Sequence, residues 1–293
     1  MVQKLIPSIW FNRNALEAAE FYAVVFPDAK ISDVQRYPTE GLSDFQKDFA
    51  GEPVTVDIDI SGFRLNLINA DNHFSPNPSI SFLLNIDPEI FADPRNEIDR
   101  MWTALTEGGS VLMPLQSYDF SEYYGWCADR FGVHWQLMLT KAEGDRRPFV
   151  NPAMLFTGQA RGWARQARQK YLDVLSVVGA SQEGTRIDYP DSPGTILFSD
   201  AQLAGEWVVI NDSTFDHGFS FTEGVSFCVL CDGQEQLDAV WAALAVQEQP
   251  CGWCKDEFGV SWQVIPANMD ELMSKPGAYE KMMGMTKIRI NQF

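Results

Sequence analysis

The chain of 293 residues lacks several features by which common protein classes are recognised. It has no run of about 18 apolar residues, the length that a membrane-spanning helix requires. Its first residues include Lys4 and Pro7 but no apolar segment of the kind found in a secretory signal peptide. Five cysteines, an odd number, do not favour a secreted disulfide framework. We therefore expect a cytoplasmic protein with no membrane partner.

Basic residues are also scarce. The 22 lysines and arginines are outnumbered by 40 aspartates and glutamates, which gives a net charge of −18. The densest basic stretch, residues 161–170, has the spacing of a solvated helix face rather than of a basic stripe. A protein that binds nucleic acid needs a basic footprint, so we expect no such partner.

No glycine-rich loop of the dinucleotide- or phosphate-binding kind is present. Methyltransferases that use S-adenosylmethionine typically have a doubly wound sheet with such a turn after its first strand. This absence argues against methyl transfer, and the sequence offers no other cofactor motif.

The chain does contain a long internal repeat. Residues 125–136 read GWCADRFGVHWQ, and residues 252–263 read GWCKDEFGVSWQ. Weaker matches pair residues 98–102 with 237–241, and Phe11 and Tyr22 with Phe156 and Tyr171. Repeats of about 140 residues have the size of domains, whereas solenoid repeats are shorter. The sequence predicts two tandem domains, at residues 1–145 and 150–293. The second is expected to be one strand shorter, before residue 251, and to carry a C-terminal extension.

Each copy is predicted to contain the order strand, helix and three strands twice over. Apolar periodicity and turn residues predict a helix at 15–26, with Asn14 as its cap and Pro27 as its stop, and another at 98–107. The predicted strands are 6–11, 30–37, 54–60, 63–68, 80–86, 111–115, 122–127 and 133–139.

Several motifs resemble those of a known family. They are Trp10-Phe11, the segments 17–22 and 26–31, Ser226-Phe227, and residues 251–266 with the GWC and FGVSWQ sequences. They resemble the PhnB-like branch of the glyoxalase/bleomycin-resistance superfamily, also called vicinal oxygen chelate. This branch is also described as 3-demethylubiquinone-9 3-methyltransferase-like.

The resemblance implies an α+β fold of two tandem glyoxalase-like domains. Each would consist of paired βαβββ modules that form a curved mixed sheet around a cleft. It further implies that the two domains associate as an intrachain pseudo-dimer, and a further homodimer stays open. Superfamily enzymes bind a divalent metal in the cleft through His and Glu side chains, and their activities include isomerases, dioxygenases and epimerases. Other members bind drugs without catalysis.

The metal positions implied by the resemblance carry unsuitable residues. They fall near Ser8 and Ala153, near Asn66 or Val208, at Ser81 and Ser226, and at Gln136 and Gln263. Neutral oxygens alone do not repay the dehydration of a divalent ion. We therefore predict no metal and no cofactor.

The cysteines suggest two other kinds of site. Cys228-x2-Cys231 and Cys251-x2-Cys254 have a zinc-ribbon spacing, and Cys251-Gly252-Trp253-Cys254 matches a redox CxxC. However, residues three apart in a strand point to opposite faces, and a redox pair needs a helix N-terminus. Buried core cysteines are the favoured interpretation.

The remaining candidates are polar and aromatic residues of the predicted strands and loops. His134 and Gln136 share one strand face, which is either a ligand surface or simply solvated. His73 and His217 lie in matching loops, where an exposed histidine without a role is the simpler interpretation. Trp126 and Trp253 are core residues or stack on an aromatic ligand, and Lys255 is a surface residue or neutralises an anion. The predicted ligand-binding residues are Trp10, Ser81, Trp126, His134, Gln136, His217, Ser226, Trp253, Lys255, Ser261 and Gln263.

These observations predict a protein that binds a small molecule in a cleft, and the tryptophans leave an aromatic ligand open as one alternative. The alternative is an isomerase, lyase or dioxygenase, either metal-assisted or using Lys255 and His134 as acid and base. A sequestering protein of the bleomycin-resistance type is the non-catalytic version of the first prediction.

Overall fold

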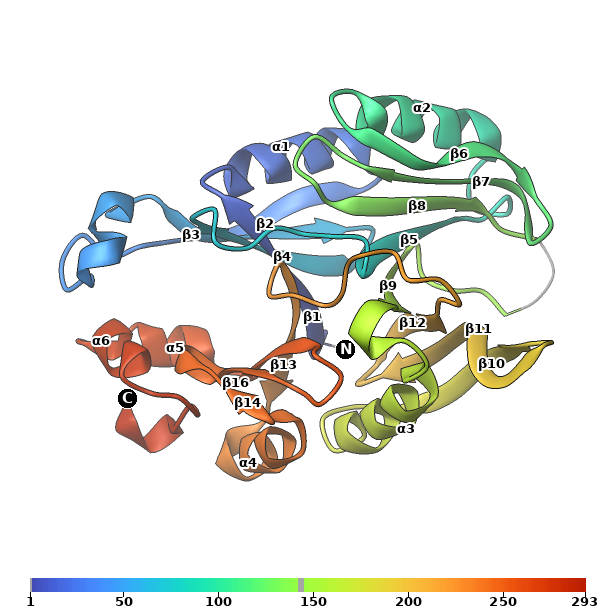
Figure 1. Cartoon of the computed structure of the whole chain (residues 1–293). Coiled ribbons are helices and arrows are strands. Elements are labelled where there is room, and N and C mark those ends of the chain that lie inside the picture. The colour runs from blue at the N-terminus through green and yellow to red at the C-terminus, as the bar shows by residue number, and fades with distance from the viewer. Residues whose placement is uncertain (1, 142–144) are drawn as a thin grey trace.

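The computed structural model describes residues 2–141 and 145–293, and its strands form two mixed sheets of eight strands each (Figure 1). Sheet A has the order β14-β15-β16-β13-β1-β4-β3-β2, and sheet B has the order β10-β11-β12-β9-β5-β8-β7-β6. The α+β fold with two tandem repeats is therefore confirmed. Among the described residues, no helix is long and apolar enough to cross a bilayer.

Four βαβββ modules follow one another along the chain. Module 1 has β1 (Leu5–Asn12), α1 (Ala15–Val25), β2 (Ala29–Arg36), β3 (Pro53–Ile60) and β4 (Phe63–Ala70). Module 2 has β5 (Ile80–Ile86), α2 (Pro94–Thr106), β6 (Ser110–Tyr118), β7 (Ser121–Ala128) and β8 (His134–Leu139). Module 3 has β9 (Val150–Phe156), α3 (Ala164–Leu175), β10 (Gln182–Tyr189), β11 (Ser192–Leu203) and β12 (Glu206–Asp212). Module 4 has β13 (Val225–Cys231), α4 (Gly233–Leu244), β14 (Gln247–Glu248), β15 (Trp253–Lys255) and β16 (Ser261–Pro266).

Strand pairing joins modules of different copies. β1 runs antiparallel to β13, with Ser8 opposite Ser226, and β5 runs antiparallel to β9, with Ser81 opposite Ala153. Sheet A is therefore built from modules 1 and 4, and sheet B from modules 2 and 3. Each sheet takes half of its strands from each copy of the repeat.

The helical sides of the sheets hold the main core and join the two modules of one copy. Trp135 and Trp262 are buried there with Tyr22 and Tyr171. Asp129, from the repeated motif, accepts hydrogen bonds from the Tyr22 hydroxyl at 2.7 Å and from Trp135 Nε1 at 2.8 Å. Asp256 takes the equivalent bonds in the second copy. Because Tyr22 is in module 1 and Asp129 in module 2, this contact ties together two modules that belong to different sheets.

Three local predictions need correction. The side chain of Asn14 makes no capping bond, and Asn69 Oδ1 instead accepts from the amide of Ala15 at 3.1 Å, because β4 ends beside the start of α1. The hairpin strand expected to be missing is present as the two-residue β14. Cys251 lies outside a strand, in a short 3-10 helix (Pro250–Gly252), with φ of 62°.

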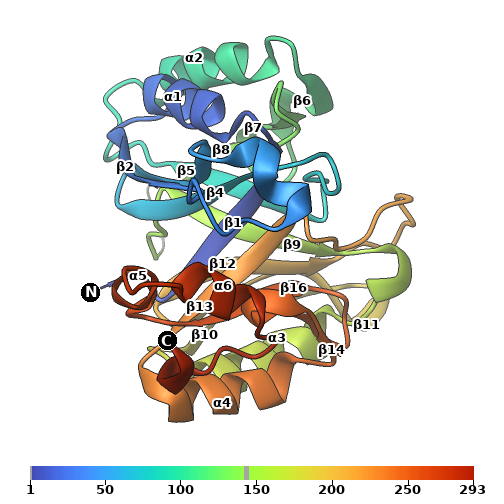
Figure 2. The same cartoon turned by 90° about the vertical axis from the view of Figure 1, so that its left-hand side faces the viewer.

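The C-terminal extension packs beside sheet A. It contains α5 (Met269–Met273) and α6 (Ala278–Met283), which Figure 2 shows in front of the strands. Its later part is held by module 4, where Met285 O accepts from the Cys251 amide at 2.8 Å. At its other end Asp270 accepts a hydrogen bond of 2.8 Å from Gln35 of β2. The extension therefore links the two halves of sheet A.

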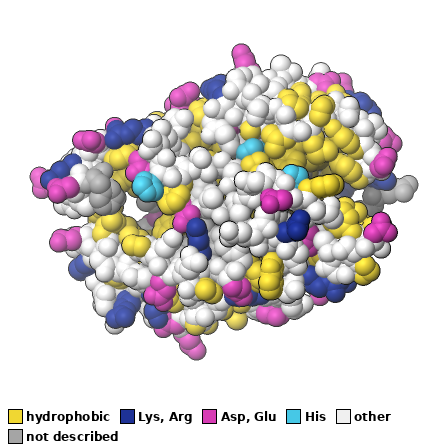
Figure 3. Space-filling view, viewed as in Figure 1, with side chains coloured by type: hydrophobic (Ala, Val, Ile, Leu, Met, Phe, Trp, Pro, Cys, Tyr) yellow, Lys and Arg dark blue, Asp and Glu magenta, His cyan; other side chains and the backbone are white. Residues whose placement is uncertain are grey.

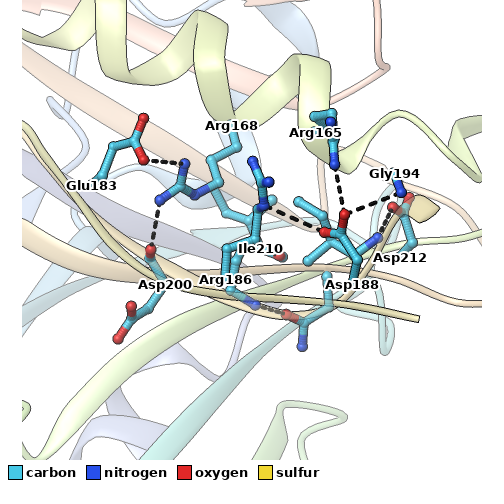
Figure 4. Close-up of polar contacts among 12 residues, drawn as sticks. Arg165, Arg168, Glu183, Arg186, Asp188, Gly194, Asp200, Ile210 and Asp212 are labelled. Carbon is cyan, nitrogen blue, oxygen red and sulfur yellow. Dashed lines mark hydrogen bonds and ion pairs between the residues drawn. The ribbon is translucent and has the colours of Figure 1, made fainter. Parts of the chain in front are cut away.

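A polar cluster fastens α3 to the outer strands of sheet B (Figure 4). Asp212 accepts from the amides of Gly162 and Ala164 at the start of α3, and from the amide of Ile196 in β11. Arg165 of α3 forms an ion pair of 2.6 Å with Asp188 of β10. Arg165, Arg168 and Lys170 of the basic 161–170 segment thus each pair with a neighbouring acid.

Candidate functional site

Each sheet has a second face, opposite its helices, which we call face A and face B. Figure 1 shows that both sheets bend, so that the two halves of each face are turned toward one another. Alternation along the strands decides which residues reach these faces. On β8, for example, Trp135 and Leu137 lie in the helical core, and His134 and Gln136 lie on face B.

A short hydrogen-bond chain lies on face B. Gln136 Nε2 donates to Ser81 Oγ at 2.7 Å, and the Tyr124 hydroxyl donates to Gln136 Oε1 at 2.7 Å. Ser81 is buried on β5, next to β8. The amide oxygen and the amide nitrogen of Gln136 are thus both hydrogen-bonded within the protein, which fixes the orientation of the glutamine.

An apolar cluster separate from the main core surrounds this chain. Its buried members are Leu83, Tyr124, Ala153 and Val209. Its partly buried members are Met113, Tyr118, Trp126, Met138 and Phe198. Figure 3 shows hydrophobic side chains gathered over the part of the molecule where Figure 1 places β6, β7 and β8. Phe120, stacked on Tyr118 at 5.5 Å, is 59% exposed at the edge of this region.

Three buried polar atoms on face B have no partner among the described residues. They are Trp126 Nε1, His134 Nδ1 and Asn151 Oδ1. Side chains of His134 and Asn151 are 7% and 2% exposed. Burial lowers the pKa of His134 to about 4, so its imidazole is neutral at neutral pH. An unpaired buried polar group costs about 1–3 kcal/mol, and such groups in native proteins usually meet water or a ligand.

One ion pair on face B is satisfied within the protein. The Arg147 guanidinium binds Asp200 at 2.6 Å and lies 3.7 Å above the ring of Trp207. Asp200 also accepts from the amide of Thr185. Face B therefore offers aromatic surface and neutral hydrogen-bonding atoms.

Face A repeats the glutamine–serine bond in more polar surroundings. Gln263 Nε2 donates to Ser226 Oγ at 3.0 Å. Beside it, Asp57 accepts from Asn66 at 2.6 Å and pairs with Arg64 at 2.5 Å. Burial raises the pKa of Asp57, and the bonds from Asn66 and Arg64 oppose this rise.

The other sequence candidates on sheet A lie toward one end of the sheet. The rings of Trp10 and Trp253 meet edge to face at 6.4 Å, and Trp10 Nε1 donates to Asp71 O. Ser261 is buried on β16, and its hydroxyl has no partner among the described residues. Lys255 binds Glu223 at 2.9 Å. Although burial opposes ionisation of Glu223, hydrogen bonds from Lys255 and Gln249 lower its pKa.

The acid–base pair considered from the sequence is divided between the two sheets. His134 is on β8 of sheet B, and Lys255 is on β15 of sheet A. His217 lies in the loop after β12, where its Nε2 is 2.8 Å from Ser213 Oγ and its ring stacks on Phe219. His73, in the matching loop, packs against Phe74, which contacts Trp10.

The superfamily metal positions come together on the faces but do not suit a metal. Face A brings together Ser8, Asn66, Ser226 and Gln263. Face B brings together Ala153, Val209, Ser81 and Gln136. The metal position expected near Val208 is occupied by Val209, because Val208 points into the helical core and Val209 pairs with Ala153. These sets hold no imidazole, thiolate or carboxylate, and the described residues contain no group of three such ligands. The residues present therefore do not fit a divalent metal.

The cysteines also behave as core residues. All five are free, and Cys231 and Cys254 belong to the helical core, whereas Cys228 is on the opposite face of β13. Burial raises the pKa of Cys228, Cys231 and Cys254 to about 12. Because Cys228 and Cys231 point to opposite faces of β13, they cannot hold one metal ion together, and the protonated thiols are poor nucleophiles at neutral pH.

Sequence reasoning missed most of the apolar lining of face B, together with Tyr124 and Asn151. Alternation along the predicted strands could have identified Leu83 and Tyr124, because they share a face with Ser81 and Trp126. Asn151 could not be found in this way, since its place next to Leu83 depends on pairing between β5 and β9.

A family model described as 3-demethylubiquinone-9 3-methyltransferase matches residues 3–138 and again residues 149–265. The chain belongs to this family. Its two matches coincide with the two copies of the repeat, which confirms the PhnB-like assignment within the vicinal oxygen chelate superfamily. The sequence matches none of the proteins with curated functions.

Solved structures that resemble this chain match either one copy of the repeat or both copies. A putative 3-demethylubiquinone-9 3-methyltransferase, the PhnB protein of Bacillus cereus, is 30% identical over 47% of this chain and 100% of its own, with a TM-score of 0.40. Protein PA1353 from Pseudomonas aeruginosa is 23% identical over 47% of this chain and 98% of its own, with a TM-score of 0.39. Glyoxalase I from Zea mays is 11% identical over 92% of this chain and 95% of its own, with a TM-score of 0.56. The last likeness shows the tandem glyoxalase fold.

Proposed function

We propose that this protein binds a small molecule on face B without the help of a metal. The supporting observation is that Trp126, His134 and Asn151 present unpartnered buried polar atoms beside an apolar cluster. A binding site for a small molecule typically combines an apolar lining with a few such polar atoms. The neutral donor sets at the superfamily metal positions support metal-free binding.

Native mass spectrometry of the untreated full-length protein tests this proposal, because it reports bound metal, bound ligand and oligomeric state together. We expect a small organic mass that survives gel filtration and no stoichiometric metal. Gln136→Leu breaks the hydrogen-bond chain on face B, and Gln263→Leu is its matched counterpart on face A. The retained mass should be lost in the first variant and kept in the second. Loss in Gln263→Leu alone, or binding that requires an added divalent metal, would contradict the proposal.

The activity in the family's description is a separate matter, and we propose that this chain does not transfer methyl groups from S-adenosylmethionine. Two mixed sheets of βαβββ modules replace the doubly wound parallel sheet of typical methyltransferases. The sequence also has no glycine-rich turn for the cofactor. Methyl transfer to a quinol acceptor at ordinary turnover, measured with labelled S-adenosylmethionine, would refute this proposal.

Two further proposals concern assembly and location. The two copies act as an intrachain pseudo-dimer, which the pairing of β1 with β13 and of β5 with β9 supports. The protein acts in the cytoplasm, and its five free cysteines are consistent with a reducing compartment. The mass measured for the native protein and the location of a tagged chain in cell fractions test these proposals.

A further inference from the structure

We infer that the ligand of face B is an uncharged aromatic molecule that bears a hydroxyl or a similar neutral group able to donate and accept hydrogen bonds. This inference rests on the proposed function and names the class of ligand. It follows from the residues of the lining, from the polar atoms and from the ion pair on this face.

The lining favours a flat ring. Trp126, Tyr118, Tyr124 and Phe198 belong to the cluster on face B, and Phe120 stacks at its edge. Met113 and Met138 add flexible thioether side chains, which pack well against aromatic rings. Aromatic side chains in such a group gain from offset or edge-to-face contact with a further ring. An aliphatic ligand would not use this geometry.

The polar atoms call for a group that both accepts and donates. Trp126 Nε1 can only donate, whereas a neutral imidazole has one accepting nitrogen. Trp126 pairs with Gln136 in the sheet, and His134 is two residues from Gln136 on the same face of β8. Trp126 and His134 are therefore diagonal neighbours on adjacent strands, within reach of one substituent. A hydroxyl that accepts from the indole and donates to the imidazole would satisfy both.

Asn151 provides a second polar point in the same row of the sheet. The row runs from Trp126 through Gln136 and Leu83 to Asn151. Three strand spacings separate its ends, about 14 Å. A second polar substituent, on the opposite side of the ring system from the first, would meet Asn151.

The Arg147–Asp200 ion pair of face B disfavours an ionised ligand on this face. Arg147 is bound to Asp200 and stacked on Trp207, so neither charge is free to pair with a ligand. Burying an unpaired carboxylate or ammonium group costs far more than burying a hydroxyl. His134 stays neutral near pH 7 and adds no compensating charge.

Isothermal titration of the full-length protein at pH 7 with three matched probes tests the inference. The probes are 2-naphthol, 2-methoxynaphthalene, which accepts but does not donate, and 2-naphthoate, which is charged. We expect 2-naphthol to bind at least about tenfold more tightly than either of the others. Trp126→Phe should weaken 2-naphthol about tenfold, and Trp241→Phe, on α4, should leave its affinity unchanged. His134→Leu should abolish the preference for 2-naphthol over 2-methoxynaphthalene.

The outcomes separate this inference from the proposed function. If 2-naphthoate binds as tightly as 2-naphthol or more tightly, and Gln136→Leu abolishes its binding, the ligand class is wrong and the site stands. If 2-naphthol and 2-methoxynaphthalene bind equally, the role of His134 as acceptor is wrong. If no probe shows binding that depends on Gln136 or Trp126, the inference falls together with the site on face B.

Discussion

The hydroxyl of Tyr22 donates a 2.7 Å hydrogen bond to Asp129, and this buried bond helps to join module 1 to module 2 within the first copy. Asp129 also accepts from Trp135 Nε1 and from the amides of Phe131 and Val133. Four donors therefore converge on one buried carboxyl group. Asp256 has the same four kinds of donor in the second copy.

We predict that Asp129→Asn lowers the free energy of unfolding by about 2–4 kcal/mol, because the NH2 group of the new amide would face hydrogen-bond donors where the carboxylate has an accepting oxygen. Asp256→Asn should have a similar effect. Urea denaturation of the full chain measures both. Tyr22→Phe removes one of the four bonds and should cost about 1 kcal/mol. Equal losses in Tyr22→Phe and Asp129→Asn would show that the carboxyl group is not the centre of this contact.

The buried imidazole of His134 predicts a pH effect on stability. Its pKa is lowered to about 4, whereas a histidine in the unfolded chain titrates near 6.5. Between these values the unfolded chain binds a proton that the folded chain does not bind, so this group's contribution to stability falls as the pH is lowered from 6.5 to 4. His134→Leu should remove up to about 1.4 kcal/mol of slope per pH unit in this window. If the free energy of unfolding changes with pH in the same way in the wild type and in His134→Leu, from pH 6.5 to 4.5, the buried neutral state of His134 is contradicted.

Asp212 is predicted to be the most sensitive residue of the cluster in Figure 4. Asp212→Ala leaves the amides of Gly162, Ala164 and Ile196 without their acceptor, and should cost about 2–3 kcal/mol. Arg165→Ala, which removes the partly exposed ion pair with Asp188 and leaves the backbone amides paired, serves as the control. It should cost less than about 1 kcal/mol, since exposed ion pairs contribute little. Thermal unfolding followed by circular dichroism ranks the two.

Exchange of strands between the copies predicts that the copies depend on each other. Residues 1–145 alone would expose β1 and β5, whose partners β13 and β9 belong to the other copy. Co-expressed as separate chains, residues 1–145 and 146–293 should co-purify as a 1:1 complex with the mass of the intact protein. The first fragment alone should self-associate or precipitate. Light scattering after gel filtration distinguishes these results from two stable monomers, which would refute the prediction.

Metal removal is predicted to have no effect. Because the positions on both faces carry only serine, asparagine, glutamine, alanine and valine, dialysis against EDTA should leave the melting temperature unchanged. Added Zn²⁺ or Ni²⁺ should not raise it. A rise that saturates at one ion per chain, and that Ser226→Ala abolishes, would overturn our interpretation of the donor sets.

The sequence was sufficient to predict the modules, their element order apart from β14, and the burial of four of the five cysteines. Periodicity and the repeat carry this information locally. In the internal repeat, Cys228 and Cys231 correspond to the apolar residues Leu83 and Ile86 of the first copy, which indicates that both cysteines occupy packing positions. The twelve-residue motif likewise marked Asp129 and Asp256, although their partners Tyr22 and Tyr171 lie far away in the chain.

The parts that could not be predicted depend on contacts between modules. The sequence of β5 does not predict that Asn151 of β9 lies beside Leu83, because this pairing joins two different modules. The capping role fell to Asn69 rather than Asn14 because β4 ends beside α1. Even the glycine that begins the repeated motif, Gly125 in one copy and Gly252 in the other, is required for two different reasons. A Cβ at Gly125 would lie 2.6 Å from the ring of Trp102, whereas Gly252 has a left-handed φ of 81°.

The exchange of strands constrains how the two halves of this gene can diverge. A substitution in β1 changes face A, and one in β5 changes face B, although both belong to the first copy. Neither copy forms a whole face by itself, so a change of either face can arise in either half of the duplication. Modules 1 and 4 together give face A its polar character, and modules 2 and 3 together give face B its aromatic character.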